Sequence, residues 1–362
     1  MKLREIKKKD YKKIKDLFSR NKLQMIKRVN WINLWKNPIV QSSKHKTLGY
    51  VIQKKNKIVG HIGLFPSEYS YKKKKLICHV LHGWVIDKVH RNLSITLMNK
   101  FLSKNNNSFY LSTTTNKNAA RIMEAFGWKK INIQGLNKTS IIILNKNNFL
   151  KRIFFNKKIF FKNLIILIIG KILGILLKNN LTKWKNYQNN ENIILYDRFD
   201  DRLDKFWTKY KKENNNKILI NKNLLWLKWL LNSHLLTKKL KIFVIKEKKN
   251  ISGYCIFIIN KKNKINFAQI LDIAVLKSHQ KNNTVPLIKR CIEEANKNNC
   301  AFFEFRNTLN KNLELMKDFR PLNIQLANNY FYFKTSSKNN NNIFTFQNWY
   351  LSSLDGDIVF NY

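Results

Sequence analysis

The stretch Leu76–Met98, LICHVLHGWVIDKVHRNLSITLM, decides the fold, and Leu111–Ile131, LSTTTNKNAARIMEAFGWKKI, repeats its plan. Each stretch predicts a buried strand, a short polar turn and then a helix. A strand that runs directly into a helix forms an anion site, because the first N–H groups of the helix have no internal partner and the helix dipole favours negative charge. The predicted elements are strands over Leu76–Ile86 and Phe109–Thr114, and helices from Arg91 and over Lys117–Phe126.

Two motifs make these units resemble the GNAT superfamily, the acetyl-CoA-dependent N-acyltransferases. In that family an Arg/Gln-x-x-Gly-x-Gly/Ala turn after the first strand holds the CoA pyrophosphate, and an Asn-x-x-Ala helix ending in Gly-Phe follows the second. The matching segments here are Arg91-Asn-Leu-Ser94-Ile-Thr96 and Asn116-Lys-Asn-Ala119 with Gly127-Trp128. The chain departs from the family where Ser94 and Thr96 replace both glycines, and where Met123 replaces a Tyr that acts as general acid in many members.

The resemblance implies an acyl-CoA co-substrate, in particular acetyl-CoA, and no metal. In the family, the pantetheine arm lies between the two parallel strands and pairs with the backbone of the first. A ligand site at the carboxyl ends of parallel strands is also expected on general grounds. The residues implied to bind acyl-CoA are Trp84, Val85 and Ile86, the turn Arg91, Asn92, Leu93, Ser94, Ile95 and Thr96, and Asn116 and Ala119.

Acyl transfer to an amine needs a group that removes a proton from the attacking nitrogen. Many family members use a Glu on the strand before the pyrophosphate turn, but Val80 stands there in this chain. His82 lies on the same strand face, and an ordinary imidazole pKa of ~6.5 suits a base near neutral pH. Glu68 is the second candidate, in the loop expected after Pro66 closes a strand over Lys57–Phe65. A core histidine bonded to backbone is an equally weighted interpretation of His82, and the hydroxyls of Ser112 and Thr113–Thr115 are candidates to assist the leaving thiolate.

The order of elements predicts an α/β (α+β) fold of two tandem GNAT-like domains, with mixed central sheets flanked by helices. Residues 1–147 form the acyl-CoA-binding domain, 148–186 a linker, and 187–362 a degenerate second domain that we do not expect to bind CoA productively. Within this scheme we expect a helix over Lys22–Trp35, a last strand of the first sheet over Ser140–Leu144, and a turn at Gln280–Val285. The strands Tyr330–Lys334 and Asn342–Phe346 would complete the second domain.

The linker is apolar and basic, and three interpretations compete. Phe149–Leu177 carries six Lys or Arg residues, and its longest clean apolar run, Leu164–Gly170, is far shorter than the ~20 residues of a membrane span. We favour interdomain helices packed on the core. A basic amphipathic segment on an anionic membrane comes second, and a true span is the weakest alternative.

Composition excludes global disorder, because 44% of the residues are hydrophobic and 13% aromatic. The net charge of +49 suggests nucleic-acid binding, but Lys and Asn are over-used throughout the chain and Arg is scarce, which indicates a general compositional bias. We therefore expect no specific nucleic-acid partner.

The four cysteines lack metal-ligand spacing and predict buried thiols. Met1–Asp10 has no signal-peptide pattern, so we expect a cytoplasmic protein, with peripheral contact at the inner membrane face through 149–177 left open.

The C-terminal segment stands out from the low-complexity tract before it. Trp349 is followed by Asp355-Gly356-Asp357, and this pattern resembles tandem GNAT-like proteins of bacterial surface-polysaccharide loci. An Asp-Gly pair is most often a turn. The functional alternative is that these two carboxylates reach a cleft and meet a substrate amine.

Three functions follow from these observations. The first is an acyl-CoA-dependent N-acyltransferase that acts on a small amine, such as an amino sugar of a surface glycan. The second is a non-catalytic GNAT-like binding or scaffold protein, which the lost glycines favour. The third is an aminoacyl-tRNA-dependent transferase, which the basic charge favours and the CoA-type turn disfavours.

Overall fold

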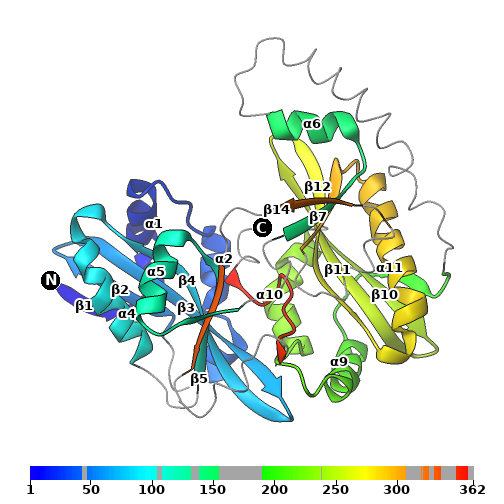
Figure 1. Ribbon diagram of the computed structural model, residues 1–362, viewed down its shortest axis with the longest axis horizontal. Helices are drawn as coiled ribbons and strands as arrows, with labels where there is room; N and C mark the ends of the chain where they lie inside the picture. The colour runs from blue at the N-terminus through cyan, green and yellow to red at the C-terminus, as the bar shows by residue number, and fades with distance from the viewer. Residues whose placement is uncertain are drawn as a thin grey trace.

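A computed structural model describes residues 1–42, 47–103, 108–131, 138–154, 190–237, 239–306, 319, 321–325, 330–335 and 348–357. Two mixed sheets lie side by side, each flanked by helices (Figure 1). This arrangement confirms the predicted fold class. The predicted linker, 148–186, is described only as far as residue 154, and the strand expected over Asn342–Phe346 lies outside the described residues.

The first sheet has the strand order β1-β2-β3-β4-β5-β15-β6, with β9 added to β3. Within it β4 and β5 are parallel, and the other described pairs are antiparallel. Its strands are β1 (Lys2–Glu5), β2 (Gly49–Lys54), β3 (Lys57–Tyr71), β4 (Lys74–Ile86), β5 (Ser108–Thr115), β6 (Lys129–Lys130), β9 (Leu219–Ile220) and β15 (Tyr330–Thr335).

The second sheet repeats this arrangement with the order β14-β7-β13-β12-β11-β10-β8. Its single parallel pair among the described strands is β12 with β13, which corresponds to β4 with β5. The strands are β7 (Lys138–Ile143), β8 (Ile193–Tyr196), β10 (Leu240–Glu247), β11 (Asn250–Lys262), β12 (Ile265–Val275), β13 (Phe302–Arg306) and β14 (Leu322–Gln325).

Helices lie between the two sheets and on the outer side of each sheet. One continuous core, which includes Tyr69 of β3, Trp226 of α10 and Tyr254 of β11, joins the facing sides of the two sheets. Helices α4 and α5 cover the other side of the first sheet, and α11 covers the second. The helices are η1 (Lys8–Asp10), α1 (Tyr11–Arg20), α2 (Arg28–Leu34), α3 (Pro38–Ser42), η2 (Lys88–Leu93), α4 (Ser94–Leu102), α5 (Lys117–Ala125), α6 (Lys146–Phe154), α9 (Asp201–Glu213), α10 (Leu224–Leu236) and α11 (Lys277–Lys297).

The two halves of the chain exchange strands. The strand β7, encoded before the linker, pairs with β13 and β14 in the second sheet, while β15, encoded near the C-terminus, pairs with β5 and β6 in the first. The expectation that Ser140–Leu144 closes the first sheet is therefore wrong, as is the assignment of Tyr330–Lys334 to the second. Both strands are short and largely apolar, and such a pattern does not indicate which of the two sheets a strand joins. The domain boundaries at 147 and 187 remain predictions.

Three local expectations also differ from the structure. The helix expected over Lys22–Trp35 begins only at Arg28, because Lys22 adopts a left-handed conformation with φ 56° and ends α1. Pro66 does not close β3, which continues to Tyr71. The turn expected at Gln280–Val285 lies inside α11 instead, where the Thr284 hydroxyl donates to the Gln280 carbonyl at 2.7 Å.

The strand exchange makes the first sheet depend on a residue near the end of the chain. Phe333 of β15 is buried in the shared core. We expect Phe333→Ala to lower the free energy of unfolding by about 3–5 kcal/mol, the usual cost of removing a buried aromatic ring. Urea unfolding measures this, and amide hydrogen exchange should show faster exchange in β5. Ile324→Ala on β14, where Ile324 is 40% exposed, is the matched control and should change stability by less than about 1 kcal/mol. Equal effects of the two substitutions would contradict the expectation.

Candidate active site

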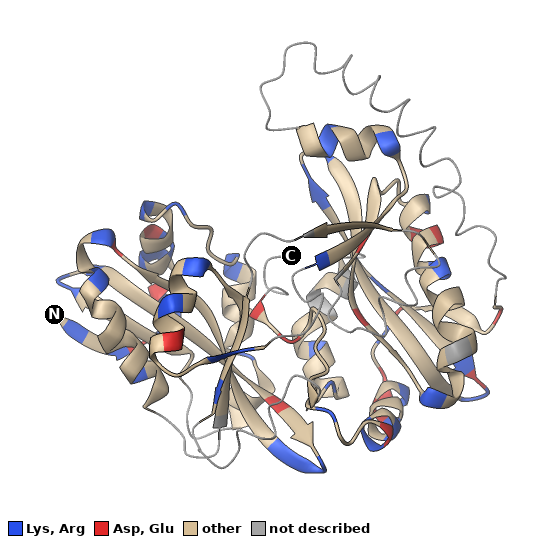
Figure 2. Ribbon diagram, in the orientation of Figure 1, with Lys and Arg blue, Asp and Glu red and all other residues tan. Residues whose placement is uncertain are grey.

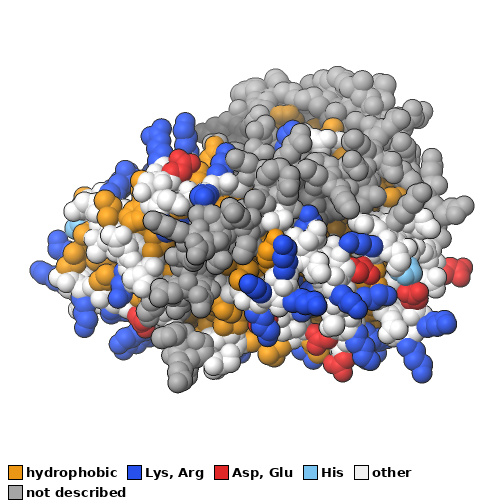
Figure 3. Space-filling model, turned by 60° about the horizontal axis from the view of Figure 1, so that its bottom comes forward, with side chains coloured by type: hydrophobic (Ala, Val, Ile, Leu, Met, Phe, Trp, Pro, Cys, Tyr) orange, Lys and Arg blue, Asp and Glu red, His pale blue; other side chains and the backbone are white. Residues whose placement is uncertain are grey.

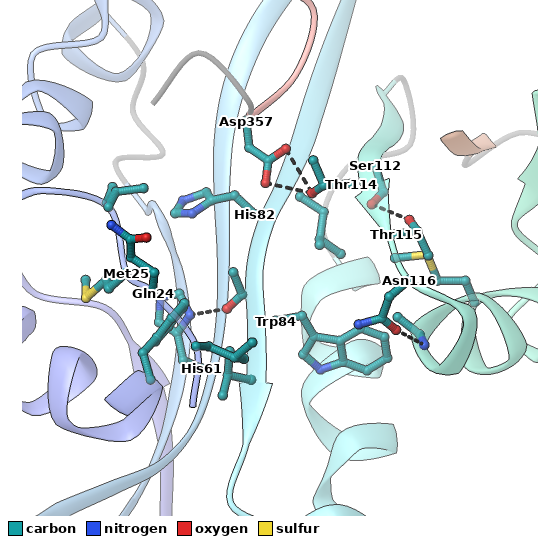
Figure 4. A pocket seen from close by; sticks show the side chains of 18 of the residues that line it. Gln24, Met25, His61, His82, Trp84, Ser112, Thr114, Thr115, Asn116 and Asp357 are labelled. Carbon is teal, nitrogen blue, oxygen red and sulfur yellow. Dashed lines mark hydrogen bonds between the residues drawn. The ribbon is translucent and has the colours of Figure 1, made fainter. Parts of the chain in front are cut away.

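A cavity lies where the two parallel strands of the first sheet separate. Strands β4 and β5 pair from Ile77 with Ser108 to Val80 with Leu111, and no further pairing is formed toward their carboxyl ends. The cavity, of 220 Å³, lies at these ends, which are also the ends expected to hold a ligand. Its lining comes from β3, β4, the end of β5, α5, the loop after α1 and the C-terminal segment (Figure 4). The lining includes Gln24, Met25, His61, His82, Trp84, Val85, Ser112, Thr114, Thr115, Asn116, Ala119, Met123 and Asp357.

A bulge in β4 shapes one wall of the cavity. The pairing of β3 with β4 shifts between His61 and Gly63, which leaves Gly83 and Trp84 opposite a single residue of β3. Gly83 adopts φ +59°, and a Cβ there would lie 2.8 Å from the Phe18 ring. Such bulges bend a strand and increase its twist, so this one turns the end of β4 away from β5.

Two buried histidines lie next to the bulge. His61 Nδ1 donates to the Gly83 carbonyl at 2.5 Å, and its ring is 6.1 Å from that of His82. The His82 ring occupies the space that a Cβ at Gly63 would fill, at 2.5 Å from its Nε2. Nε2 of both histidines is buried and has no hydrogen-bond partner among the described residues.

Burial changes the chemistry expected of His82. Burial, followed by the neighbouring His61, lowers the pKa of His82 to about 3, and burial lowers the pKa of His61 to about 4. Both rings are therefore neutral at pH 7. The structure places His82 at the cavity, as predicted, but removes the argument that its pKa matches a base working at neutral pH. In the tautomer that carries its proton on Nδ1, the Nε2 of His82 is a hydrogen-bond acceptor.

The other predicted base does not line the cavity. Glu68 lies farther along β3, where its carboxylate accepts a hydrogen bond from the Asn221 side chain at 2.8 Å and lies 3.8 Å from Lys75 Nζ. It therefore joins β3 to the segment next to β9. The sequence placed Glu68 in a loop because Pro66 was expected to end the strand.

The residues predicted to bind acyl-CoA fall into two groups. Trp84, Val85, Asn116 and Ala119 line the cavity. Asn116 also caps α5, since its side chain accepts a hydrogen bond from the Ala119 N–H at 2.9 Å. Ile86 and the turn Arg91–Thr96 do not line it. The turn is a 3-10 segment followed by α4, which begins at Ser94 rather than at Arg91, and the Arg91 side chain is exposed.

The C-terminal segment brings a carboxylate to the cavity. At the end of β5, Asp357 accepts hydrogen bonds from the Thr114 hydroxyl at 2.9 and 3.0 Å (Figure 4). It also accepts one from the Thr113 hydroxyl at 3.1 Å. Gly356 makes this approach possible, because a Cβ there would lie 1.8 Å from the Thr113 hydroxyl. Of the two acids singled out in the sequence, Asp357 thus reaches the cavity and Asp355 does not.

Asp355 anchors the segment instead. It is 1% exposed and accepts hydrogen bonds from the Tyr69 hydroxyl at 3.0 Å and from Ser352 N–H and Oγ at 2.7 and 2.8 Å. Burial raises the pKa of Asp355, against the opposing effects of Lys222 and the bonds from Ser352. Lys222, itself fully buried, lies 3.3 Å from Ser352 Oγ and 2.7 Å from an oxygen of Asp272 on β12.

The loop after α1 supplies the residues that sequence reasoning missed. Leu23, Gln24, Met25 and Ile26 line the cavity, although the pattern assigned them to a helix. Asn21 could have indicated that a helix ends before this loop, because Asn is common where helices end. Its side chain bonds both to the Leu17 carbonyl at 2.9 Å and to Asp87 at 3.1 Å.

Comparison with known proteins gives structural relatives only. No protein-family model matches the chain, and no curated protein matches its sequence. It is similar to Saccharomyces cerevisiae N-myristoyltransferase with bound myristoyl-CoA (TM-score 0.55, 11% identity, 92% of this chain and 81% of that one) and to a GCN5-related N-acetyltransferase from Anabaena variabilis (0.56, 10%, 93% and 73%). The chain has the GNAT fold. A probable N-acyltransferase from Enterococcus faecalis is also similar (0.56, 10%, 92% and 72%).

The described residues contain neither a membrane-spanning helix nor a metal-binding cluster. No helix among them is long and apolar enough to cross a membrane. No group of three or more His, Cys, Asp or Glu side chains in the described part of the chain is arranged to hold a metal ion. All four cysteines are buried and unpaired, as predicted.

The bulge predicts a specific sensitivity to substitution. We expect Gly83→Ala to destabilise the protein by about 2–4 kcal/mol, because it combines a left-handed alanine with a contact against Phe18. Gly60→Ala on β3 is the control, since a Cβ there meets Ile52 at an acceptable 3.4 Å, and we expect a change below about 1 kcal/mol. Urea unfolding measures both. A stable Gly83→Ala protein would show that the bulge is not required.

The buried histidines predict a loss of stability at mildly acidic pH. The pKa of His61 and of His79 is lowered by burial to about 4, and that of His82 to about 3, whereas the unfolded chain titrates near ~6.5. As the pH falls from 6.5 toward 4, the unfolded state gains protons that the native state does not, so the free energy of unfolding decreases. Urea unfolding at pH 7 and pH 5 measures the decrease, which should be smaller in His82→Gln. An equal decrease in that variant would contradict the assignment.

Proposed function

We propose that the chain is an acyl-CoA-dependent N-acyltransferase whose acceptor amine binds in the cavity between β4 and β5. The observation that carries this proposal is the position of Asp357, a carboxylate held by two threonine hydroxyls at the end of β5 in a protein of net charge +49. A carboxylate at this point attracts an ammonium group. The GNAT fold supports the same reaction class, because an N-myristoyltransferase and a GCN5-related N-acetyltransferase share it.

In the proposed reaction Asp357 binds the acceptor ammonium and takes up its proton, directly or through water. The free amine then attacks the thioester carbonyl, so that a C–N bond forms and the C–S bond breaks. In this proposal the backbone N–H groups of Trp84 and Val85, two residues that line the cavity, stabilise the developing oxyanion. The leaving thiolate takes a proton from solvent or through the hydroxyls of Ser112 and Thr115, which lie 2.7 Å apart. His82 Nε2 accepts a hydrogen bond from the amine.

The acyl-CoA would lie along the end of β4 and over the turn Arg91–Thr96. Arg91 is exposed and forms no ion pair with any described residue, which leaves its guanidinium available for a pyrophosphate. Asp87, directly before this turn, is occupied differently. Although burial raises its pKa, hydrogen bonds from Arg20 and Asn21 hold it below its usual value, and these bonds tie the turn to the end of α1.

The resemblances found in the sequence, to the GNAT superfamily and to tandem GNAT-like proteins of surface-polysaccharide loci, suggest a specific donor and acceptor. We propose acetyl-CoA as the donor and an amino sugar of a surface glycan as the acceptor. We also propose that the second half does not bind CoA productively, which is supported by the absence of a turn at Gln280–Val285, where α11 continues without interruption.

Asp357→Asn tests the assignment of the carboxylate. We expect kcat/KM to fall by a factor of about 10²–10⁴, the usual contribution of a general base, while acetyl-CoA binding is unchanged. The assay follows release of the CoA thiol with acetyl-CoA and a panel of amino sugars. Asp16→Asn, at an exposed position of α1, is the control and should keep parental activity. Activity retained in Asp357→Asn would exclude its role as the base.

Arg91→Ala tests the donor site without requiring turnover. Acetyl-CoA at a hundredfold excess over its dissociation constant should stabilise the parent protein by about 2.7 kcal/mol, and this gain should be lost in the variant. Thermal unfolding with and without acetyl-CoA measures the difference, and Lys88→Ala on the same exposed turn is the control. No stabilisation of the parent at millimolar acetyl-CoA would refute the acyl-CoA proposal.

A further inference from the structure

A second hollow lies beside the candidate active site, on the surface of η1, α1 and α2. It has a volume of 770 Å³. We call it the basic groove, because five cationic side chains line it together with three apolar or aromatic ones. Its lining residues are Lys8, Lys9, Lys12, Lys15 and Arg28, with Tyr11, Trp31 and Ile32.

The groove is richer in basic side chains than the chain as a whole. Lys and Arg are spread over both halves of the molecule (Figure 2), also on the face shown in Figure 3, and make up 70 of the 362 residues. In the groove they make up five of the eight lining residues. Lys12 and Lys15 lie three residues apart on α1, so they are neighbours on one face of that helix, and Lys8 and Lys9 lie in η1 directly before it.

The charge of the groove is not neutralised within the described part of the protein. None of its five cations forms an ion pair with a described carboxylate. Asp10, the acid nearest in sequence, is 4% exposed and is held by Arg4 through bonds of 2.6 and 2.9 Å. Like charges on one helix face repel each other, and a bound anion would relieve that repulsion.

The groove and the cavity share one side chain. Trp31 lines both, is 1% exposed, and is fixed by a hydrogen bond of 3.0 Å from its Nε1 to the Lys8 carbonyl. The Tyr11 ring packs against it with centroids 6.0 Å apart. The buried Trp31 ring therefore stands between the cavity that contains Asp357 and the basic groove, and the two hollows adjoin at this ring.

We infer that the acceptor is an anionic amine, whose carboxylate or phosphate groups lie in the basic groove while its ammonium pairs with Asp357. This inference rests on the proposed function. The charges of the two hollows are opposite, as a molecule with a cationic amine and an anionic body requires. Attraction to the groove would also raise the rate of encounter at low salt.

Equilibrium binding of two peptides with the same N-terminal amine tests the inference. The probes are Gly-Glu-Glu-Glu-Glu-NH2 and Gly-Gln-Gln-Gln-Gln-NH2, measured by calorimetry at physiological salt without an acyl donor. We expect the acidic peptide to bind at least tenfold more tightly. In Lys12→Glu/Lys15→Glu this preference should disappear, because both positions are exposed and line the groove.

The control variant carries the same change in net charge elsewhere. Lys261→Glu/Lys262→Glu alters two exposed lysines at the end of β11 in the second sheet and should keep the full preference. An equal loss in both variants would show attraction to bulk charge and overturn the inference, as would equal binding of the two peptides. An acetylated acidic peptide, which lacks the ammonium, should bind more weakly to the parent, and unchanged binding would overturn the pairing with Asp357.

Turnover separates this inference from the proposed function. Release of the CoA thiol from acetyl-CoA with no preference for acidic over neutral acceptors would refute the anionic acceptor alone. A binding preference that is lost only in the groove variant, without thiol release for any amine, would refute the acyltransferase and leave the groove as an anion site.

Discussion

The buried contact between Lys222 and Asp272 is the constraint on which the candidate site depends. Both side chains are fully buried, and removal of either would destabilise the protein, because the other charge would then be buried without a partner. Tyr254 bonds the second oxygen of Asp272 at 2.5 Å, and Ser352 connects Lys222 to Asp355. A continuous polar chain thus runs from the second sheet to the C-terminal segment. The second half of the protein therefore contributes to the site by fixing the segment that carries Asp357.

The first sheet supplies the other half of the site. Its parallel pair separates after Val80, and the bulge at Gly83 directs the end of β4 away from β5. The C-terminal segment then lies against β5, where Gly356 permits close packing on Thr113. The site is therefore composite. Strand geometry provides the opening for a ligand, and a distant part of the chain provides the carboxylate.

The sequence predicted what short-range patterns determine. It identified the strand–helix units, the start of α5 after Asn116, and the position of His82 and Trp84 toward the end of β4, because alternation, helical spacing and caps are local properties. It did not identify the exchange of β7 and β15, because strand pairing depends on contacts across more than 160 residues. For Asp355 and Asp357, a position in a cleft was only the weaker of two interpretations. The stronger was a plain turn, because an Asp-Gly pair has the same local pattern in both cases. The low pKa of His82 arises from burial and from His61, which the sequence does not place together.

The exchange of strands affects how the chain can fold during synthesis. Tyr110 and Leu111 of β5 remain without their antiparallel neighbour until residues 330–335 have left the ribosome. The first sheet is thus encoded early but completed late, and an open strand edge persists while most of the chain is made. A chain divided between the halves would give two fragments that each carry one strand of the other's sheet.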